Sequence, residues 1–474
     1  MPQASRASPP SPRAVTADCG FFFNLQHEAR KHTKKPVFMS SLCAAPSVAA
    51  AYAPDELIAI FTANAVKLEP MRDMIKEACG IDPEDKRFII VDCRHVPDFG
   101  EAVAVVIAEN RHLAEDAAER VIVDWEPLPA AGHCEAALKP GAPIVHAGRT
   151  DNIAGRLNLG FGDVDDAFRN AAHVVRERYA PHRGTGHPME CRGVAAAYDL
   201  VGDAFRIWSS TQTPHNTQRA VVEMFGMAED HVRVITPDVG GGFGPKNQVY
   251  PEELVIPAVA RLLGRPIKWA EDRREHFLTT TQERDQVWDM AAAVDADGRL
   301  LGVKGTLIHD AGAYLPWGII MPYISATTLP GPYKLPAYRI AVTVAFTNLV
   351  PTTPLRGAGR PQAVFAMERL MDAVARETGL DPAEVRRRNF IQASDMPYDM
   401  GLTYRDGAPV MYDTGDYPEA QAQALAKAGY DSFPERQQAA LAEGRHIGIG
   451  IGNYVEGTGL GPFEGATVRI LTNG

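Results

Sequence analysis

The sequence lacks three features that would each assign a chain to a familiar class of protein. Its 474 residues include only six cysteines and no C-x-x-C pair, which excludes a disulfide framework, a zinc ribbon and a cysteine-ligated iron–sulfur domain. No apolar run reaches about 18 residues, so no membrane-spanning helix is expected. Basic residues (48) are fewer than acidic residues (59), and the net charge of −11 argues against a nucleic-acid binder. The cysteine usage predicts a reducing, cytoplasmic location.

The composition that remains is that of a globular protein of two to four domains. Hydrophobic residues make up 45% and charged residues 23% of the chain, which excludes disorder as the main state. Residues 1–51 are left unassigned, because their start is rich in Pro, Ser and Ala and is expected to be partly disordered.

Residues 52–150 are predicted to form a small α/β domain. The β-branched run Glu101–Ala108 predicts a buried strand, Arg111–Arg120 a short helix and Val121–Trp125 a returning strand. Strand, helix and strand in this order are typical of an α/β unit.

Residues 151–474 mix hairpins with helices. Trp288–Val294 and Leu300–Ile308, joined by a Gly-containing turn, predict a β-hairpin, and residues 338–348 alternate as a strand does. A helix is expected to end at Gly379, and Asp381 is expected to cap the next helix. The strand-like Gly465–Leu471 is followed by Asn-Gly without a return strand, so we expect the chain to be cut in mid-domain.

A glycine-rich segment, Pro237–Lys246, carries the strongest local signal. It lies between a predicted strand, Val232–Ile235, and a predicted helix, Glu252–Leu263. Four glycines in five positions allow the backbone to approach a ligand and to direct N–H groups at it. A dinucleotide fingerprint fails at Pro245, and a P-loop fails because Asn247 follows the lysine. The alternative interpretation is a tight structural turn.

Two further segments could present polar groups to a ligand. Leu355–Gln362 offers backbone donors at a predicted helix start, and Trp208–His215 contains Gln212 just after a predicted strand. Each of these segments alone is typical of an ordinary loop.

Taken together, six segments occur in the order that is found in one family. They are Pro188-Met-Glu-Cys-Arg-Gly193, Ser210-Thr-Gln212, Val239-Gly-Gly-Gly-Phe-Gly244, Asp310-Ala-Gly-Ala-Tyr314, Leu355-Arg-Gly-Ala-Gly-Arg-Pro-Gln362 and Tyr454-Val-Glu-Gly-Thr-Gly459. Over residues 52–474 the chain resembles the large, molybdopterin-binding subunit of the xanthine dehydrogenase / aldehyde oxidase / carbon monoxide dehydrogenase family. The resemblance implies an α+β chain with a small α/β hammerhead domain (52–150) and the first part, residues 151–474, of a mixed α/β molybdenum-cofactor-binding domain.

The resemblance also implies a molybdenum hydroxylase, which takes oxygen from water and passes electrons to iron–sulfur clusters and FAD. The metal is held by the pterin, for which the cytosine dinucleotide form is one candidate, and by no protein side chain. By the family pattern Gln212 would hydrogen-bond a ligand of molybdenum, while the two glycine-bearing loops would cradle the metal and the pterin. The cofactor-binding residues so implied are Gln212, Gly241, Gly242, Phe243, Gly244, Arg356, Gly357 and Ala358.

Two departures from the family pattern narrow the expected substrate. Gly357 stands where carbon monoxide dehydrogenase carries a copper-binding cysteine, so no copper is expected. Asn247 stands where purine-oxidising members carry a glutamate, so purines are disfavoured. An aldehyde or an N-heterocycle remains. The expected partners are an FAD-binding medium subunit and a [2Fe–2S] small subunit, assembled as a dimer of heterotrimers.

No catalytic residue is assigned, because the glutamate base of the family belongs to sequence expected beyond residue 474. Glu190, Glu456 and Glu464 are not in the motif of that base and are expected to be structural or solvated. Two alternatives stay open. One is a catalytically inactive remnant that serves at most as an interaction surface. The other is a zinc hydrolase using His182, His187 and Cys191, whose spacing matches no known metal pattern.

Overall fold

The structure is a computed structural model that describes residues 105–123 and 125–457, together with four short strands before them. These strands pair in parallel, β1 with β2 and β3 with β4. Their bounds are β1 Val15–Thr16, β2 Val37–Phe38, β3 Ile58–Thr62 and β4 Phe88–Asp92.

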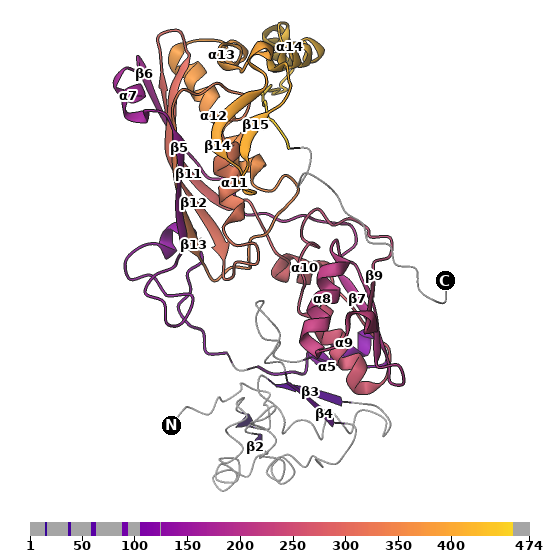
Figure 1. Cartoon of the computed structure of the whole chain (residues 1–474). Helices are drawn as coiled ribbons and strands as arrows, with labels where there is room; N and C mark the ends of the chain where they lie inside the picture. The colour runs from indigo at the N-terminus through magenta and orange to yellow at the C-terminus, as the bar shows by residue number, and fades with distance from the viewer. Residues whose placement is uncertain are drawn as a thin grey trace.

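A five-stranded mixed sheet organises the larger lobe, at the top of Figure 1. Its order is β5-β13-β12-β11-β6, with β12 and β13 parallel and the other neighbours antiparallel. The predicted hairpin and the predicted strand at 338–348 are confirmed. The bounds are β5 Ile153–Phe161, β6 His173–Tyr179, β11 Gln286–Val294, β12 Leu300–Gly312 and β13 Tyr338–Phe346.

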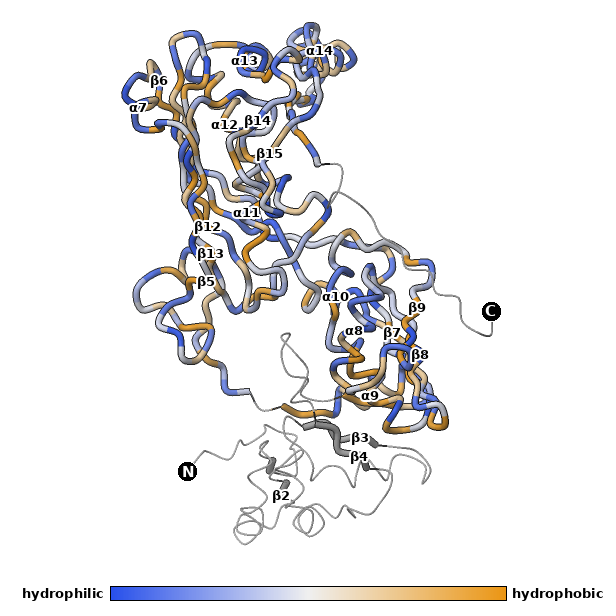
Figure 2. The backbone as a smooth tube through the Cα atoms, in the orientation of Figure 1, coloured by the Kyte–Doolittle hydropathy of each residue, from blue (hydrophilic) through white to orange (hydrophobic). Residues whose placement is uncertain are grey.

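Both faces of this sheet carry helices, because successive side chains of a strand point to opposite sides. Trp288 and its same-face neighbours form the main core with α12 (Arg360–Thr378) and α11 (Ile320–Thr328). Val287 faces the other way and clusters with Cys134 of α6 (Cys134–Ala137). The strands of the large sheet include prominent hydrophobic stretches in Figure 2.

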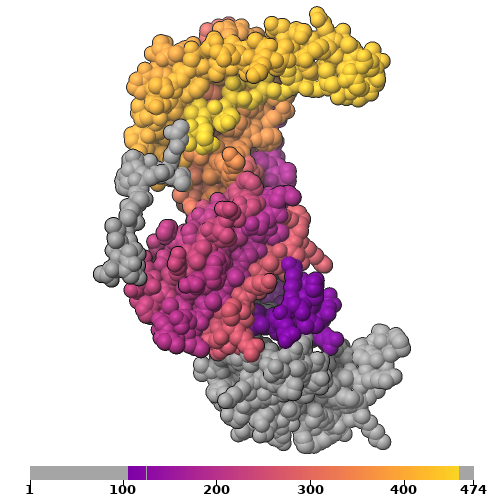
Figure 3. All heavy atoms as spheres, turned by 90° about the vertical axis from the view of Figure 1, so that its right-hand side faces the viewer, coloured from indigo at the N-terminus to yellow at the C-terminus, as the bar shows by residue number. Residues whose placement is uncertain are grey.

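A four-stranded mixed sheet, β10-β7-β8-β9, forms the smaller lobe. Two helices, α8 and α9, contact each other and pack on it through Val221 and Leu254. The predicted strand Val232–Ile235 and the predicted helix Glu252–Leu263 are confirmed. The bounds are β7 Gly193–Asp199, β8 Ala204–Ser209, β9 Val232–Ile235, β10 Ile267–Ala270, α8 Pro214–Phe225 and α9 Glu252–Leu263. Figure 3 shows the two lobes one above the other.

The predicted helix boundaries near residue 380 are confirmed. Helix α12 ends at Gly379, whose φ of 69° suits a glycine. Asp381 then caps the next helix, because its side chain accepts the N–H groups of Ala383 and Glu384. The remaining elements are α7 Val164–Arg169, η4 Glu229–His231, α10 Arg273–Thr279, α13 Pro382–Asn389, η5 Ala393–Asp395, β14 Tyr398–Thr403, β15 Pro409–Tyr412, α14 Tyr417–Ala428 and α15 Phe433–Ala442.

The prediction for residues 101–125 is only partly right. Helix α5 (Arg111–Ala118) forms, but residues 105–108 and 121–123 are not strands, and residues 101–104 and 124 lie outside the described part. Val105 and Ile107 instead pack against Val255 and Val259 of α9. These apolar side chains are therefore buried against a helix, and packing on a helix removes them from water as well as packing in a sheet would. The division at residue 150 and the prediction for 465–471, which lies outside the described residues, stay predictions.

Across the described residues, no helix combines the length and the apolar character that a membrane crossing requires.

Candidate functional site

Three loops meet where the two lobes join. The first follows β8 and carries Gln212, the second joins β9 to α9, and the third joins β13 to α12. The Gln212 N–H donates to Lys246 O (2.8 Å), and Gln212 Oε1 accepts the Gly244 N–H (2.9 Å). The Arg356 N–H donates to Phe243 O (2.8 Å). The structure thus brings together the segments that the sequence singled out.

Glycine is required where these loops approach each other most closely. A Cβ built on Gly244 would lie 1.8 Å from Pro354 O, at a φ of 112° that disfavours any other residue. A Cβ on Gly242 would lie 2.5 Å from Gln212 Oε1. The loops can touch only because these positions have no side chain.

Backbone strain concentrates at the same place. Only four non-glycine residues in the described part have a positive φ, and three of them, Phe243, Arg284 and Ala358, lie at these loops. Such residues are uncommon and cost about 1–3 kcal/mol each, so they persist where the surroundings hold them and cluster at functional sites.

Several backbone N–H groups of the site are left available. Within the described residues, the N–H groups of Gly241, Gly242, Phe243 and Gly357 have no protein acceptor. Their neighbours do have one, since Gly240 donates to Glu190 Oε2 at 2.9 Å. Consecutive free N–H groups beside positive-φ residues form a concavity that suits an anion or an oxo group.

An ion pair between a buried lysine and a partly exposed glutamate anchors the glycine-rich loop. Lys246 Nζ, whose side chain is fully buried, donates to Glu190 Oε1 (2.8 Å) and Ser210 Oγ (2.7 Å). Burial acts to raise the pKa of Glu190, but Lys246, Ser210 and the Gly240 N–H outweigh it and lower that pKa. A carboxylate held in its charged form is a weak base, so Glu190 is a structural residue here, as the sequence suggested.

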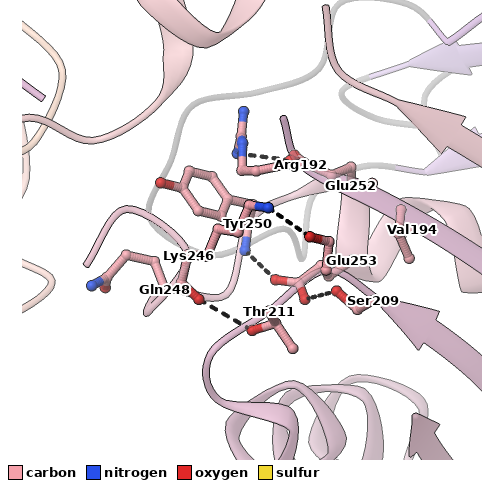
Figure 4. A pocket seen from close by; sticks show the side chains of 11 residues that line it. Arg192, Val194, Ser209, Thr211, Lys246, Gln248, Tyr250, Glu252 and Glu253 are labelled. Carbon is pink, nitrogen blue, oxygen red and sulfur yellow. Dashed lines mark hydrogen bonds and ion pairs between the residues drawn. The ribbon is translucent and has the colours of Figure 1, made fainter. Parts of the chain in front are cut away.

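A second charged cluster supports the loop from behind (Figure 4). Glu253 accepts hydrogen bonds from Ser209 Oγ (2.6 Å) and from the Tyr250 N–H (3.0 Å). The Arg192 guanidinium stacks 3.6 Å from the centre of the Tyr250 ring and lies 2.7 Å from Glu252 Oε1. Burial raises the pKa of Glu252 to about 7, against the effect of Arg192. This packing fixes the residues that lead from the loop into α9.

Glu283 and Arg284 belong to the site although the sequence gave no reason to select them. They lie between α10 and β11, outside every motif. Arg284 Nη2 donates to Arg356 O (2.9 Å), and Glu283 is fully buried at the start of α12. Neither their spacing nor their residue types distinguish them from other surface-like charges, so only the fold reveals them.

The alternative zinc ligands do not come together. His182 and His187 are exposed. In the described part, the acidic, histidine and cysteine groups that could hold a metal are Cys191–Glu271–His276 and Cys134–Asp285–Asp310, and neither contains His182 or His187. Glu271 of the first group already bonds both His276 and Arg192. The zinc hydrolase hypothesis has no site in this geometry.

The other two glutamates that were considered can also be placed. Glu456 Oε1 lies 3.0 Å from Arg360 Nη1 and is partly exposed, as a structural carboxylate would be. Glu464 lies outside the described residues.

The loops therefore combine backbone N–H groups that have no protein acceptor in the described residues with glycines where the loops approach each other most closely. Residues 145–390 match the family model described as the molybdopterin cofactor-binding domain. The chain belongs to the molybdopterin-binding large subunits of the xanthine dehydrogenase / carbon monoxide dehydrogenase family.

Relatives of known function support this membership. The gamma subunit of the 6-hydroxypseudooxynicotine dehydrogenase complex of Paenarthrobacter nicotinovorans is 38% identical, over 79% of this chain and 47% of the relative. The nicotine 6-hydroxylase large subunit of the same organism is 37% identical, over 78% and 45%. Quinoline 2-oxidoreductase from Pseudomonas putida 86 superposes with a TM-score of 0.66 at 35% identity, over 71% of this chain and 42% of that chain. The chain spans about half the length of the curated relatives it matches.

Proposed function

We propose that this chain is the molybdopterin-holding part of the large subunit of a molybdenum hydroxylase. The reaction would oxidise an N-heterocycle or an aldehyde, with water as the source of oxygen. The observation that carries the proposal is the set of free N–H groups on two loops that touch, next to the Gln212 side chain.

The residues present fit the cofactor. The N–H groups of Gly241, Gly242 and Phe243 would face electronegative atoms of the metal centre and the pterin, and the Gly357 N–H would do so from the second loop. Gln212 is oriented by the Gly244 N–H on its oxygen, which leaves its amide NH2 to donate to a bound group. Arg356 and Gly244 keep the two loops in contact, and the Ala358 N–H, which donates to Leu355 O (2.7 Å), keeps the second loop turned. When bound, the molybdenum would supply a Lewis acid for water and an acceptor of two electrons.

The substrate class follows from two observations. Gly357 leaves no thiolate for copper. The relatives named for nicotine and quinoline, at 37% and 35% identity, exceed the carbon monoxide dehydrogenase large chain of Hydrogenophaga pseudoflava at 32%. Nicotine and quinoline are N-heterocycles, so we favour an N-heterocycle over an aldehyde.

The electrons would leave through partner subunits. The sequence contains no cysteine pattern for an iron–sulfur cluster, so a [2Fe–2S] small subunit and an FAD-binding medium subunit are proposed, in a dimer of heterotrimers. The 6-hydroxypseudooxynicotine relative is likewise named as a subunit of a complex.

Metal and pterin analysis of the purified native assembly tests this proposal. We expect about one molybdenum and one pterin per copy, and reduction of a dye with an N-heterocycle as donor. Gln212→Ala should lower the molybdenum content, while Gln438→Ala, a change at an exposed position of α15, should not. Zinc without molybdenum would refute the proposal.

A second candidate is an inactive chain that acts as an interaction surface. Cofactor content separates the two, since an inactive remnant would copurify with the partner subunits but without stoichiometric molybdenum and without turnover.

A further inference from the structure

Residues 280–284 form the support on which the Arg356 loop rests. The Glu283 N–H donates to Gly184 O (2.7 Å), and the Gly184 N–H donates back to Glu283 O (2.9 Å). On the other side the Thr353 N–H donates to Gln282 O (2.8 Å). Backbone hydrogen bonds to Gly184 on one side and Thr353 on the other thus hold this segment in place beside the loop.

The two side chains of this support meet the loop with opposite polarity. The Glu283 carboxylate faces the Gln362 side-chain amide and the N–H groups of Leu355 and Gly359. Arg284 Nη2 donates to Arg356 O at 2.9 Å, and Arg284 Nε lies 3.7 Å from Glu283 Oε2. The Glu283 carboxylate therefore lies against the N–H side of the loop, and Arg284 supplies a donor to a carbonyl of the loop.

Glu283 also occupies the positive end of a long helix. Gly359 is the N-cap of the 19-residue helix α12, and no side chain of that cap bonds the first turn. An anion at such an end is favourable, because the unpaired N–H groups and the helix dipole point at it. Glu283 supplies that anion from a segment about 76 residues earlier in the chain.

The buried Glu283 carboxylate lacks hydrogen bonds of standard geometry although polar groups surround it. Both oxygens of Glu283 and both side-chain amide atoms of Gln362 are buried and make no hydrogen bond of standard geometry in the described structure. Burial raises the pKa of Glu283 to about 7, whereas Arg284, Gln362 and the two N–H groups act to lower it. Natural proteins seldom keep such a buried group unless it serves a purpose.

We infer that Glu283 and Arg284, here called the Glu283–Arg284 clamp, are positioning residues that hold the loop Leu355–Gly359 in its strained shape. The clamp fixes the peptide units on either side of Gly357, so the Gly357 N–H stays directed at the cofactor. The positive φ of Arg284 (72°) places its side chain under the loop. The inference deepens the proposed function, because it takes this loop as part of the cofactor site.

Hydrogen exchange of the cofactor-free full-length chain tests the clamp without relying on activity. Glu283→Leu removes the acceptor, and we expect exchange in the peptide covering residues 354–360 to become roughly tenfold faster. Glu283→Gln retains an oxygen acceptor and should restore most of the protection. Glu368→Gln is the control for Glu283→Gln, since this carboxylate is also buried (6% exposed) but bonds Arg386 and Tyr333 instead of the loop.

Arg284→Gly keeps the test decisive if Glu283→Leu does not fold. Glycine relieves the positive φ, so the fold should tolerate the change, while the bond to Arg356 O is lost. We expect faster exchange of 354–360 and, in the assembled holoenzyme, an altered Mo(V) paramagnetic resonance signal with faster loss of pterin.

Wild-type protection in both Glu283→Leu and Arg284→Gly would overturn the clamp, and so would equal loosening in Glu368→Gln. Failure of the proposed function looks different. In that case the wild-type assembly contains no molybdopterin, while the exchange results still decide whether the clamp holds the loop.

Discussion

Replacing Gly244 by alanine should separate the two loops that form the site. The new Cβ would lie 1.8 Å from Pro354 O and must retreat to about 3.0 Å, so the loops have to shift by about 1.2 Å. That shift acts directly on the bond from the Arg356 N–H to Phe243 O, which is 2.8 Å long.

The expected cost can be worked out from these contacts. Losing the bond to Phe243 O and weakening the bond from the Gly244 N–H to Gln212 Oε1 removes about 0.5–1.5 kcal/mol each. A non-glycine residue in the left-handed region adds about 1–2 kcal/mol. We expect a loss of about 2–5 kcal/mol in the free energy of unfolding, and cofactor content well below that of the wild type.

Urea unfolding and molybdenum analysis of the variant and a matched control provide the measurement. Gly226→Ala is the control, because Gly226 also has a positive φ (62°) but a Cβ there meets nothing within 4 Å. It should show only the backbone cost, about 1 kcal/mol, with normal molybdenum content. If the two variants were equally stable and equally loaded, contact between the loops would not be what holds the cofactor.

Three other predictions concern buried charges. Burial lowers the pKa of His309 to about 3, whereas the unfolded histidine takes up a proton below about pH 6.5. The free energy of unfolding should therefore fall by about 1.4 kcal/mol per pH unit between about pH 6.5 and pH 3. His309→Gln should flatten this part of the pH profile of thermal unfolding. Burial opposes ionisation of Glu271, but His276 and Arg192 lower its pKa to about 2. The contribution of Glu271 to the free energy of unfolding is therefore complete above about pH 4.5 and disappears towards pH 2. An unchanged loss of stability between about pH 4.5 and pH 2 in Glu271→Gln would contradict this. Arg386 is fully buried against Glu368 and Asp372, and Arg386→Met should cost about 3–5 kcal/mol in urea unfolding because two carboxylates lose their partner; a loss below about 1 kcal/mol would count against the pairing.

Much of the fold could be predicted because local signals were strong. The helix Glu252–Leu263 and the strand Val232–Ile235 have the predicted bounds, since each combines a clear period with a glycine or proline boundary. The strand prediction is wrong at residues 105–108, because the β-branched Val105 and Ile107 cover the α9 surface as readily as such residues pair in a sheet. A pattern of apolar residues indicates which side chains are buried, but it does not identify the element against which they pack.

Some residues of the candidate site could be predicted from the sequence and others could not. The glycine-rich loops were visible in the sequence because close approach restricts which residues fit, as at Gly244 and Gly242. Glu283 and Arg284 could not be predicted, because the sequence does not show whether a charged side chain is buried and only tertiary packing determines this. Whether the loop residues contact the pterin stays a prediction for the experiments above.

The segment near residues 451–457 gives the site a second edge. Arg386 Nη2 reaches Ile451 O (3.3 Å) near one end of the segment, and Arg360, the first residue of α12, pairs with Glu456 near the other. The backbone thus doubles back along α12 until it is level with the Arg356 loop. The last described residues therefore return to the N-terminus of α12, and the Arg360–Glu456 ion pair ties them to the helix start that follows the Arg356 loop.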